Sequence, residues 1–487
     1  MVGGNGAAGT GGRRRAAFTF ERTRMSAPAV TETRTSLAEA PTSGDAAETA
    51  NRTALPAAGV GSEFAAGQAS VPVAASVPAA VAPGPASAAA PSGGAGTAPA
   101  SGLLARLGLR GRALGIANWL AVALAVYVLI TAVNVIGAGF KIAAGDQAES
   151  LFAFAVNPLV GLMIGVVATA LTQSSSTTTS VTVGLVAGGL PLAVAVPIIM
   201  GANIGTTLTS TLVSLGMVRE KESFRRGFAA ATVHDFFNLL AVLIFLPLEM
   251  MFGLLGRASS ALAGLAMGSD GGVVATVLGG VGAVVKGATS PPAELIEASL
   301  AWLPGVWQGI VMILVAVALI LLVVNAIGRM LKVLLVGRAE RVLHTAIGRG
   351  PLAGIGSGAL VTVMVQSSST TTALVVPLAG SGALSLRQLF PFTLGANIGT
   401  TITALIAAFA FDGPAGQVAL TAALVHLLFN VFATAVIYGL PVLRELPLRG
   451  ATVLADLAAE KKVYAAAWVL GVFIVLPLSL ILLTAVM

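Results

Sequence analysis

The amino-acid sequence predicts an all-α polytopic membrane protein made of two inverted-topology repeats, with re-entrant hairpins and broken helices, behind a disordered N-terminal tail. Three observations lead to this prediction. Hydrophobic residues make up 56% of the 487 residues and charged residues 10%, several apolar runs are long enough to cross a bilayer, and a set of polar motifs occurs twice. With a mean hydropathy of +0.93, most of this chain cannot be a water-soluble domain.

Five apolar runs reach the roughly 20 residues that a helix needs to cross about 30 Å of hydrocarbon. Each run is continuous in Ala, Leu, Val and Ile, whereas the strands of a membrane β-barrel alternate, so we expect helices as the spanning elements. The chain has no cysteine, which excludes disulfides and cysteine-ligated metal sites. The runs comprise residues 116–138, 227–247, 307–327, 418–440 and 464–486.

The net charge of +7 does not indicate a nucleic-acid partner, because the basic residues cluster beside the apolar runs. Basic residues at such places orient a protein in the membrane. Residues 1–102 consist mainly of Ala, Gly, Pro, Ser and Thr, and we expect them to form a disordered tail on the cytoplasmic side. We expect the remainder to be a multi-pass protein of the inner (plasma) membrane of the cell.

Three motifs recur in one order, which indicates a duplicated structural unit. They are Gln-Ser-Ser-Ser-Thr-Thr-Thr, Gly-Ala-Asn-Ile-Gly-Thr-Thr and His-x-x-Phe-Asn, and their second copies lie 193, 194 and 192 positions after the first. Such similar offsets do not arise by chance. The motifs begin at Gln173 and Gln366, at Gly201 and Gly395, and at His234 and His426.

Loop charges predict that the two copies are inverted in the membrane, because Lys and Arg mark cytoplasmic loops. Four basic residues lie between 219 and 226, after the first Gly-Ala-Asn segment, whereas the matching loop at 411–417 has none. The loops after the two His motifs have the opposite bias. The predicted parts are a first repeat at 115–266, an extracytoplasmic connector at 267–302, a second repeat at 303–463 and an additional transmembrane helix at 464–487.

Uncharged polar side chains are concentrated around the motifs. Residues 151–218 contain no Asp, Glu, Lys, Arg or His, yet they hold Gln173, Asn203 and many hydroxyls, and the second copy has a similar composition. Buried hydroxyls and amides need partners. Neutral oxygens are the ligands of a small hard cation such as sodium, so the composition indicates a sodium site. Packing between membrane helices is the alternative role of these side chains.

Prolines and glycines within the apolar runs predict interrupted helices. The N-termini of half-helices hold anions, and freed carbonyl oxygens hold cations. The Gly-x-x-x-Gly spacing is also typical of close helix packing, which is an alternative reading of the same residues. The predicted breaks are Pro197, Gly201, Gly205, Pro391, Gly395 and Gly399.

His234 and His426 lie on apolar helices, where an ionisable residue is a candidate functional residue by default. Neither has a partner that the sequence reveals, so we favour a role in structural support for both. The second copy has Leu427 at the position that is equivalent to Asp235, and the role of Asp235 stays unassigned.

These motifs resemble those of the type II sodium/phosphate cotransporter family, including its bacterial members. The resemblance rests on the two Gln-Ser-Ser-Ser runs, each followed by Gly-Ala-Asn-Ile-Gly-Thr, and on the stretch from Phe224 to Glu249. It implies a symporter that imports inorganic phosphate with sodium by alternating access, with the two Gln-Ser-Ser-Ser hairpins meeting at the binding centre. The phosphate- and sodium-binding residues that it implies are Gln173, Ser174, Ser175, Ser176, Asn203, Thr206, Gln366, Ser367, Ser368, Ser369, Asn397, Thr400 and Thr403.

Other functions are open as alternatives. A sodium-coupled transporter of another tetrahedral oxyanion, such as sulfate or arsenate, meets the same physical requirements, and an anion pore needs no obligatory sodium. A membrane-embedded hydrolase needs a base beside its serine or a carboxylate cluster for a metal, and the sequence offers neither. We therefore expect no enzyme and no cofactor, with sodium as the coupling ion and with phosphate and the lipid bilayer as partners.

Overall fold

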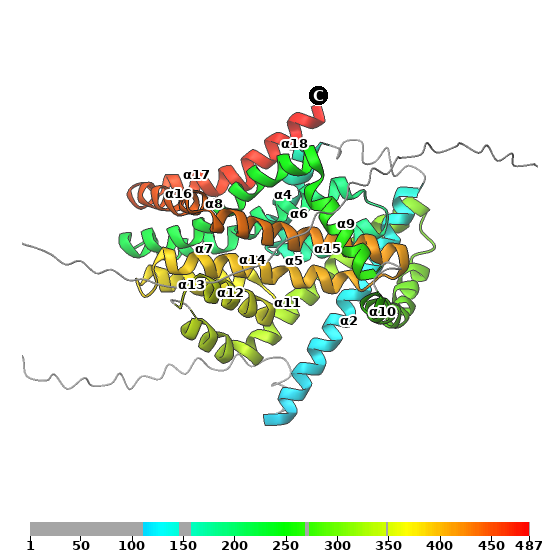
Figure 1. Ribbon diagram of the computed structural model, residues 1–487. Helices are drawn as coiled ribbons and strands as arrows, with labels where there is room; N and C mark the ends of the chain where they lie inside the picture. The colour runs from blue at the N-terminus through cyan, green and yellow to red at the C-terminus, as the bar shows by residue number, and fades with distance from the viewer. Residues whose placement is uncertain (1–110, 146–156, 268–271, 347–348, 487) are drawn as a thin grey trace, which may run out of the picture. The chain divides into compact units, whose positions relative to one another are not determined.

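The computed structural model describes residues 111–145, 157–267, 272–346 and 349–486 of the chain. Within these ranges every regular element is a helix, which confirms the predicted all-α membrane class (Figure 1). The tail predicted at 1–102 lies outside the described residues.

The helices follow one another along the two predicted repeats. The first repeat contains α2 (Gly111–Ala144), α4 (Pro158–Thr172), α5 (Ser175–Ala187), α6 (Leu192–Thr206), α7 (Leu208–Leu215), α8 (Lys221–Phe252) and α9 (Leu254–Met267), and α10 (Gly272–Ser299) lies in the connector. The second contains α11 (Gly305–Ala346), α12 (Pro351–Val365), α13 (Ser368–Gly380), α14 (Leu386–Ala408), α15 (Gly413–Ala433) and α16 (Pro441–Glu460). α17 (Val463–Leu470) and α18 (Leu476–Val486) end the chain, and π-helical turns occupy 434–438 and 471–475.

Seven helical segments of the described residues are long and apolar enough to cross a membrane. Three of them contain the predicted runs 116–138, 227–247 and 307–327, and two, Gly413–Tyr438 and Val463–Thr484, contain all but the last two residues of 418–440 and 464–486. The other two, Leu192–Leu215 and Leu386–Ala408, are the segments that carry the Gly-Ala-Asn motifs. Their polar residues lower the hydropathy, and 78% of the most apolar 18-residue stretch of each is buried, so these residues face protein and not lipid.

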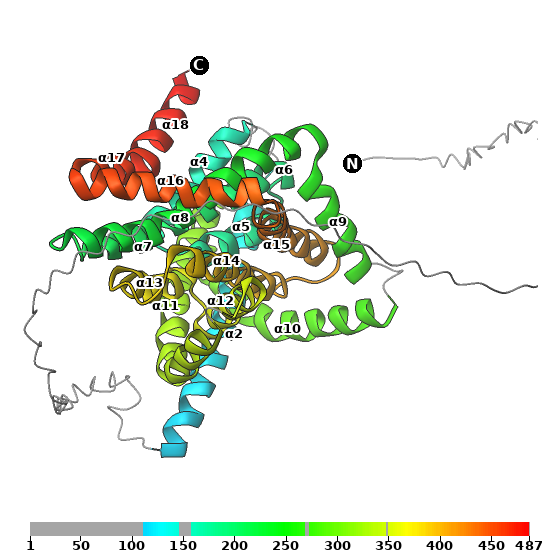
Figure 2. The same cartoon turned by 60° about the vertical axis from the view of Figure 1, so that its left-hand side comes forward.

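The two halves of the described chain pack through equivalent helices. α2 lies against α11, the first helix of the second half. α5 packs against α14 and α15 of the second half, while its counterpart α13 packs against α7 and α8 of the first. In the same way α9 packs on α15 and α16 packs on α8 (Figures 1 and 2). Reciprocal contacts of this kind are expected of two repeats related by a two-fold axis.

The predicted helix breaks are wrong. α6 is continuous through Pro197, Gly201 and Gly205, and α14 is continuous through Pro391, Gly395 and Gly399. In the first half the helical run is interrupted only at Thr207, between α6 and α7.

The glycines serve close helix packing instead. A Cβ atom at Gly201 would collide with the carbonyl oxygen of Leu162 in α4, and one at Gly395 would collide with that of Ile355 in α12. Backbone therefore touches backbone in the α4–α6 pair and again in the α12–α14 pair. The packing gained at these contacts outweighs the low helix propensity of glycine.

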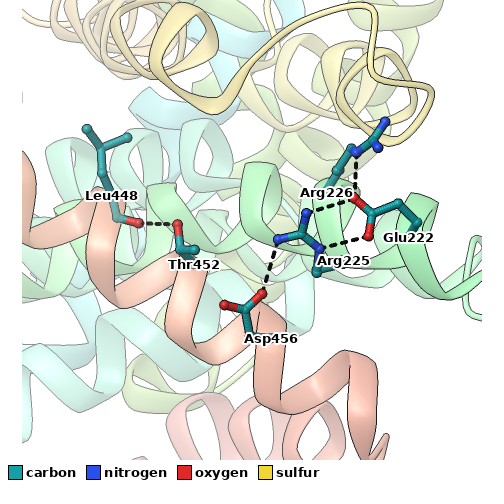
Figure 3. Close-up of polar contacts among 6 residues, drawn as sticks. All are labelled: Glu222, Arg225, Arg226, Leu448, Thr452 and Asp456. Carbon is teal, nitrogen blue, oxygen red and sulfur yellow. Dashed lines mark hydrogen bonds and ion pairs between the residues drawn. The ribbon is translucent and has the colours of Figure 1, made fainter. Parts of the chain in front are cut away.

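Charged side chains join α8 to α16. Arg225 donates to Glu222 on its own helix and, at 3.1 Å, to Asp456 of α16 (Figure 3). Arg226 donates to the same Glu222 carboxylate at 2.9 Å. All four side chains are more than a third exposed, so solvent screening keeps the stabilising contribution of these ion pairs small.

Two other ion pairs connect elements far apart in the chain. Arg387, at the start of α14, donates twice to Glu445 of α16, at 2.7 and 2.8 Å. The Arg387 guanidinium holds the pKa of Glu445 below its ordinary value. Lys286 of α10 donates to Asp412, which precedes α15, at 2.5 Å.

Candidate functional site at the two hairpin tips

Each Gln-Ser-Ser-Ser motif forms the turn between two short helices, α4 and α5 or α12 and α13. The turn residue is the glutamine, and its backbone is left-handed, with φ of 53° at Gln173 and 56° at Gln366. These are the only non-glycine residues with positive φ in the described ranges. A left-handed conformation is unfavourable for a residue with a Cβ and persists where surrounding contacts compensate for it.

The glutamine side chains supply that compensation in the same way at both tips. Nε2 of Gln173 donates to the carbonyl oxygen three residues earlier at 2.6 Å, and its Oε1 accepts from Thr209 at 2.8 Å. Gln366 donates to Val363 O at 2.8 Å and accepts from Thr403 at 3.0 Å. Each tip is thereby hydrogen-bonded to the segment that follows the Gly-Ala-Asn motif of its own half.

The serines of each tip have different roles. Ser174 and Ser367 are N-caps, whose Oγ atoms accept from the amides of Thr177 and Thr370 at 3.2 Å. This capping stabilises a helix by about 1 kcal/mol. The next serines are buried inside the first turns of α5 and α13. In the described part of the chain the hydroxyls of Ser175, Ser176 and Ser368 have no protein hydrogen-bond partner, so they are available to a ligand.

The tips meet the opposite half of the molecule. Ser369 Oγ lies 3.4 Å from the carbonyl oxygen of Thr206 at the end of α6, and Ser210 of α7 shares a 2.6 Å hydrogen bond with Thr372 of α13. No hydrogen bond between described residues joins the serines of one tip directly to those of the other. Each tip helix packs on the other half, and the meeting of the two hairpins at one binding centre stays a prediction.

The remaining predicted residues are buried on α6 and α14. Thr206 and Thr400 donate to carbonyl oxygens four residues earlier, at 2.9 and 3.1 Å, which leaves the lone pairs of their hydroxyl oxygens accessible to a cation. Asn203 also bonds within its own helix, to Ile199 O at 2.9 Å. Asn397 differs, because its amide bridges two side chains of α8.

Two residues of that bridge, His234 and Asn238, are not among the predicted ligands. His234 Nε2 donates to Asn397 Oδ1 at 2.6 Å, and Asn397 Nδ2 donates to Asn238 Oδ1 at 2.8 Å. Asn238 in turn donates to the carbonyl oxygen of Asn203 at 2.7 Å. His234 thus has a partner after all, in the other half of the chain.

Asp235 is the only buried acidic side chain among the described residues. Trp468 of α17 donates to its Oδ2 at 2.7 Å, while Oδ1 has no hydrogen-bond partner. Thr207 and Thr211 lie beside the same carboxylate, although their hydroxyls donate to main-chain carbonyls. No Lys or Arg of the described ranges is buried, which makes this carboxylate a candidate cation ligand.

Two site residues could have been found in the sequence. Thr209 is absent from the predicted set, although its counterpart Thr403 is included and the motif offset of 194 leads directly to it. Asp235 was noticed but had no partner in the sequence, because Trp468 is 233 residues away.

With this geometry the chain can be compared with known proteins. The family model of the Na+/Pi-cotransporter matches residues 128–268 and 319–442, and each match contains one copy of the three motifs. The chain belongs to the Na+/Pi-cotransporter family. No solved structure matches the chain.

Relatives of this member of the family include two groups of curated proteins. It is 32% identical over 419 residues to the sodium-dependent phosphate transport protein 2A of Ovis aries, and 31% identical over 440 residues to protein 2B of Homo sapiens. The alignments cover 72% of this chain and 65% and 63% of those proteins. The chain therefore spans slightly less than two thirds of the length of these relatives.

Proposed function

We propose that this protein is a sodium-coupled symporter that imports inorganic phosphate across the inner (plasma) membrane by alternating access. The single observation that supports this most strongly is the pair of matching tips, each with a left-handed glutamine, a capping serine and buried serines with unused hydroxyls. The relatives named for sodium-dependent phosphate transport supply the identity of the two substrates.

Phosphate is held, in this proposal, by hydrogen-bond donors and not by fixed cations. The hydroxyls of Ser175 and Ser368 and the free amides at the N-termini of α5 and α13 are donors of the kind that bind phosphate oxygens. Gln173 and Gln366 position the tips. Ser174 and Ser367 act through the helix caps and contact phosphate less than their neighbours do.

Sodium supplies the positive charge. Among the described residues no Arg or Lys is buried, so a phosphate dianion inside the membrane needs another source of compensation. Thr206, Thr400 and Thr403 provide neutral oxygens, and Asp235 provides the one buried carboxylate. Because each ion lowers the cost of burying the other, their affinities are coupled and the coupling is reciprocal.

Binding of labelled phosphate to the purified protein tests the proposal. We expect tight binding in sodium buffer and at least about tenfold weaker binding when choline replaces sodium. Ser175→Ala and Ser368→Ala remove one donor each, which should weaken phosphate binding about ten- to hundredfold. Ser381→Ala, at the exposed far end of α13, is the matched control and should bind like the unmodified protein.

The same assay separates the alternatives. Wild-type phosphate affinity in sodium-free buffer would contradict sodium coupling and favour a pore. Displacement of phosphate by equimolar sulfate would contradict phosphate as the preferred anion.

A further inference from the structure

The His-x-x-Phe-Asn motif is duplicated, yet its two copies are bonded differently. His234 and Asn238 lie on α8, and His426 and Asn430 lie on α15. All four side chains are at most 1% exposed. α8 packs against α14, which carries Asn397, and α15 packs against α6, which carries Asn203. Each histidine helix therefore adjoins the Gly-Ala-Asn helix of the other half.

On the first side the motif is bonded across the two halves, although Nδ1 of His234 is buried without a hydrogen-bond partner in the described ranges. His234 bonds Asn397 at 2.6 Å, Asn397 bonds Asn238 at 2.8 Å, and Asn238 reaches the backbone of Asn203 at 2.7 Å. Because Asn397 Oδ1 accepts, the proton of the imidazole is on Nε2.

On the second side the equivalent bonds are absent. Asn203 and Asn430 instead donate to carbonyl oxygens four residues earlier in their own helices, both at 2.9 Å. Both ring nitrogens of His426 and the Oδ1 atom of Asn430 are buried without a partner in the described ranges. One turn further along the chain, where the π-helical turn after α15 begins, the hydroxyl oxygen of Thr434 is also buried without one. A stripe of unsatisfied polar groups in a membrane interior is costly unless another state satisfies it.

We propose that the two motifs alternate, so that His426 engages Asn203 in the opposite state of the transport cycle while His234 releases Asn397. This inference rests on the proposed transport function. His234 and His426 are then positioning residues, each of which fixes the asparagine of the opposite half in one state only. The exchange replaces one set of hydrogen bonds with an equivalent set, which keeps the two states close in free energy and lets both be populated.

The residues around the motifs are compatible with such an exchange. Asp235 and its partner Trp468 accompany the first motif, whereas Leu427 stands at the equivalent position of the second. The two states are therefore related without being identical, and sodium at Asp235 could bias the exchange toward one of them.

Two substitutions with opposite expected effects test the exchange. His426→Leu removes the unsatisfied imidazole of the described state, so this variant should be at least as heat-stable as the unmodified protein and should accumulate in the described state. His234→Leu removes the bond to Asn397, so it should be less stable and should shift to the opposite state. Replacement of either histidine by glutamine keeps a side-chain donor near the place of Nε2. Each Gln variant should therefore resemble the unmodified protein more closely than the Leu variant does.

The populations can be read as distances between spin labels. The chain has no cysteine, so Val218→Cys and Ser381→Cys place one label on an exposed turn of each half. Each His→Leu variant should change the ratio of the two distance populations by about fivefold or more, in opposite directions. The double His→Leu variant should return toward the original ratio with slow transport.

Shifts in the same direction, or no shift in either variant, would overturn the exchange. A fall in the heat stability of His426→Leu would overturn it too, because it would mean that water or another group already satisfies His426. These readouts are made without phosphate, so they can fail while sodium-dependent phosphate binding persists. Loss of that binding in the unmodified protein contradicts the proposed function separately.

Discussion

At the two hairpin tips, the turn glutamines and the capping serines share their backbone angles and hydrogen bonds, whereas at the two His-x-x-Phe-Asn segments the equivalent residues do not. Gln173 and Gln366 differ by 3° in φ, and both accept from a threonine of the following segment. His234 has a partner in the opposite half, and His426 has none in the described ranges. The same duplicated sequence therefore produces one symmetric region and one asymmetric region.

The two regions differ in how far apart in the sequence their hydrogen-bonded residues lie. The bonds of the turn glutamine and the capping serine span at most 37 residues and belong to one half, so each copy of the motif builds its own turn. The bond of His234 spans 163 residues and joins the halves. The formation of this bond depends on how the halves are placed, so it reports conformation, while the turns at the tips report only the local fold.

The largest contrast that we expect between the halves is in membrane orientation. If the repeats are inverted, the loop before α8 and the loop before α15 lie on opposite sides. A cysteine at Glu220 should be protected from an impermeant thiol reagent in whole cells, and one at Ala415 should be labelled. Permeabilised cells, in which both should react, provide the control. Equal labelling from one side would mean that the halves are parallel.

A large loss of stability should follow substitution of the packing glycines. A Cβ atom at Gly358 would strike the carbonyl oxygen of Phe392 in α14, so Gly358→Ala should lower the free energy of unfolding by about 1–3 kcal/mol or more. Gly356→Ala, two residues away on α12, has nothing within 4 Å and should be neutral or slightly stabilising. Thermal unfolding of the purified variants measures both.

The first half offers the matching test. Gly165→Ala would place a Cβ atom against the carbonyl oxygen of Ile198, so its loss of stability should equal that of Gly358→Ala. A tolerated substitution at Gly165 alone would show that the helix pairs of the two halves are not equivalent.

The smallest effects that we expect are at the threonines that bind the tip glutamines. Thr209→Val and Thr403→Val each delete one neutral hydrogen bond at nearly constant volume, a change of about 1 kcal/mol. Each should weaken phosphate binding by about fivefold, and by the same factor within error. Phosphate binding isotherms of the two variants, measured in sodium buffer, give the two affinities for comparison. Unequal factors would mean that the two tips contribute differently although their glutamines have matching bonds.

Much of the fold could be predicted from the sequence because it depends on hydrophobicity. The five predicted runs are helices, and the motif offsets identify helices that occupy equivalent places in the packing. The helix breaks were predicted wrongly, because glycine and proline disfavour isolated helices, and the contacts that favour Gly201 and Gly395 are visible only once α4 and α12 are in place.

The candidate site was predictable to a similar extent. Its serines and glutamines belong to recognisable motifs, but nothing in those motifs distinguishes the capping Ser367 from Ser368 with its unused hydroxyl. The partner of His234 could not be found, since no local rule links residues 163 positions apart. Whether the predicted residues bind phosphate and sodium stays a prediction.

The backbone contacts at the glycines have a mechanical consequence. Where a carbonyl oxygen of α4 fills the place of a missing side chain on α6, a slide by one residue would drive it into a Cβ atom. Neither α4 and α6 nor α12 and α14 can shear past each other, so each pair must move as one rigid piece. The exchange that we propose then takes place outside these pairs, where α8 meets α14 and α15 meets α6.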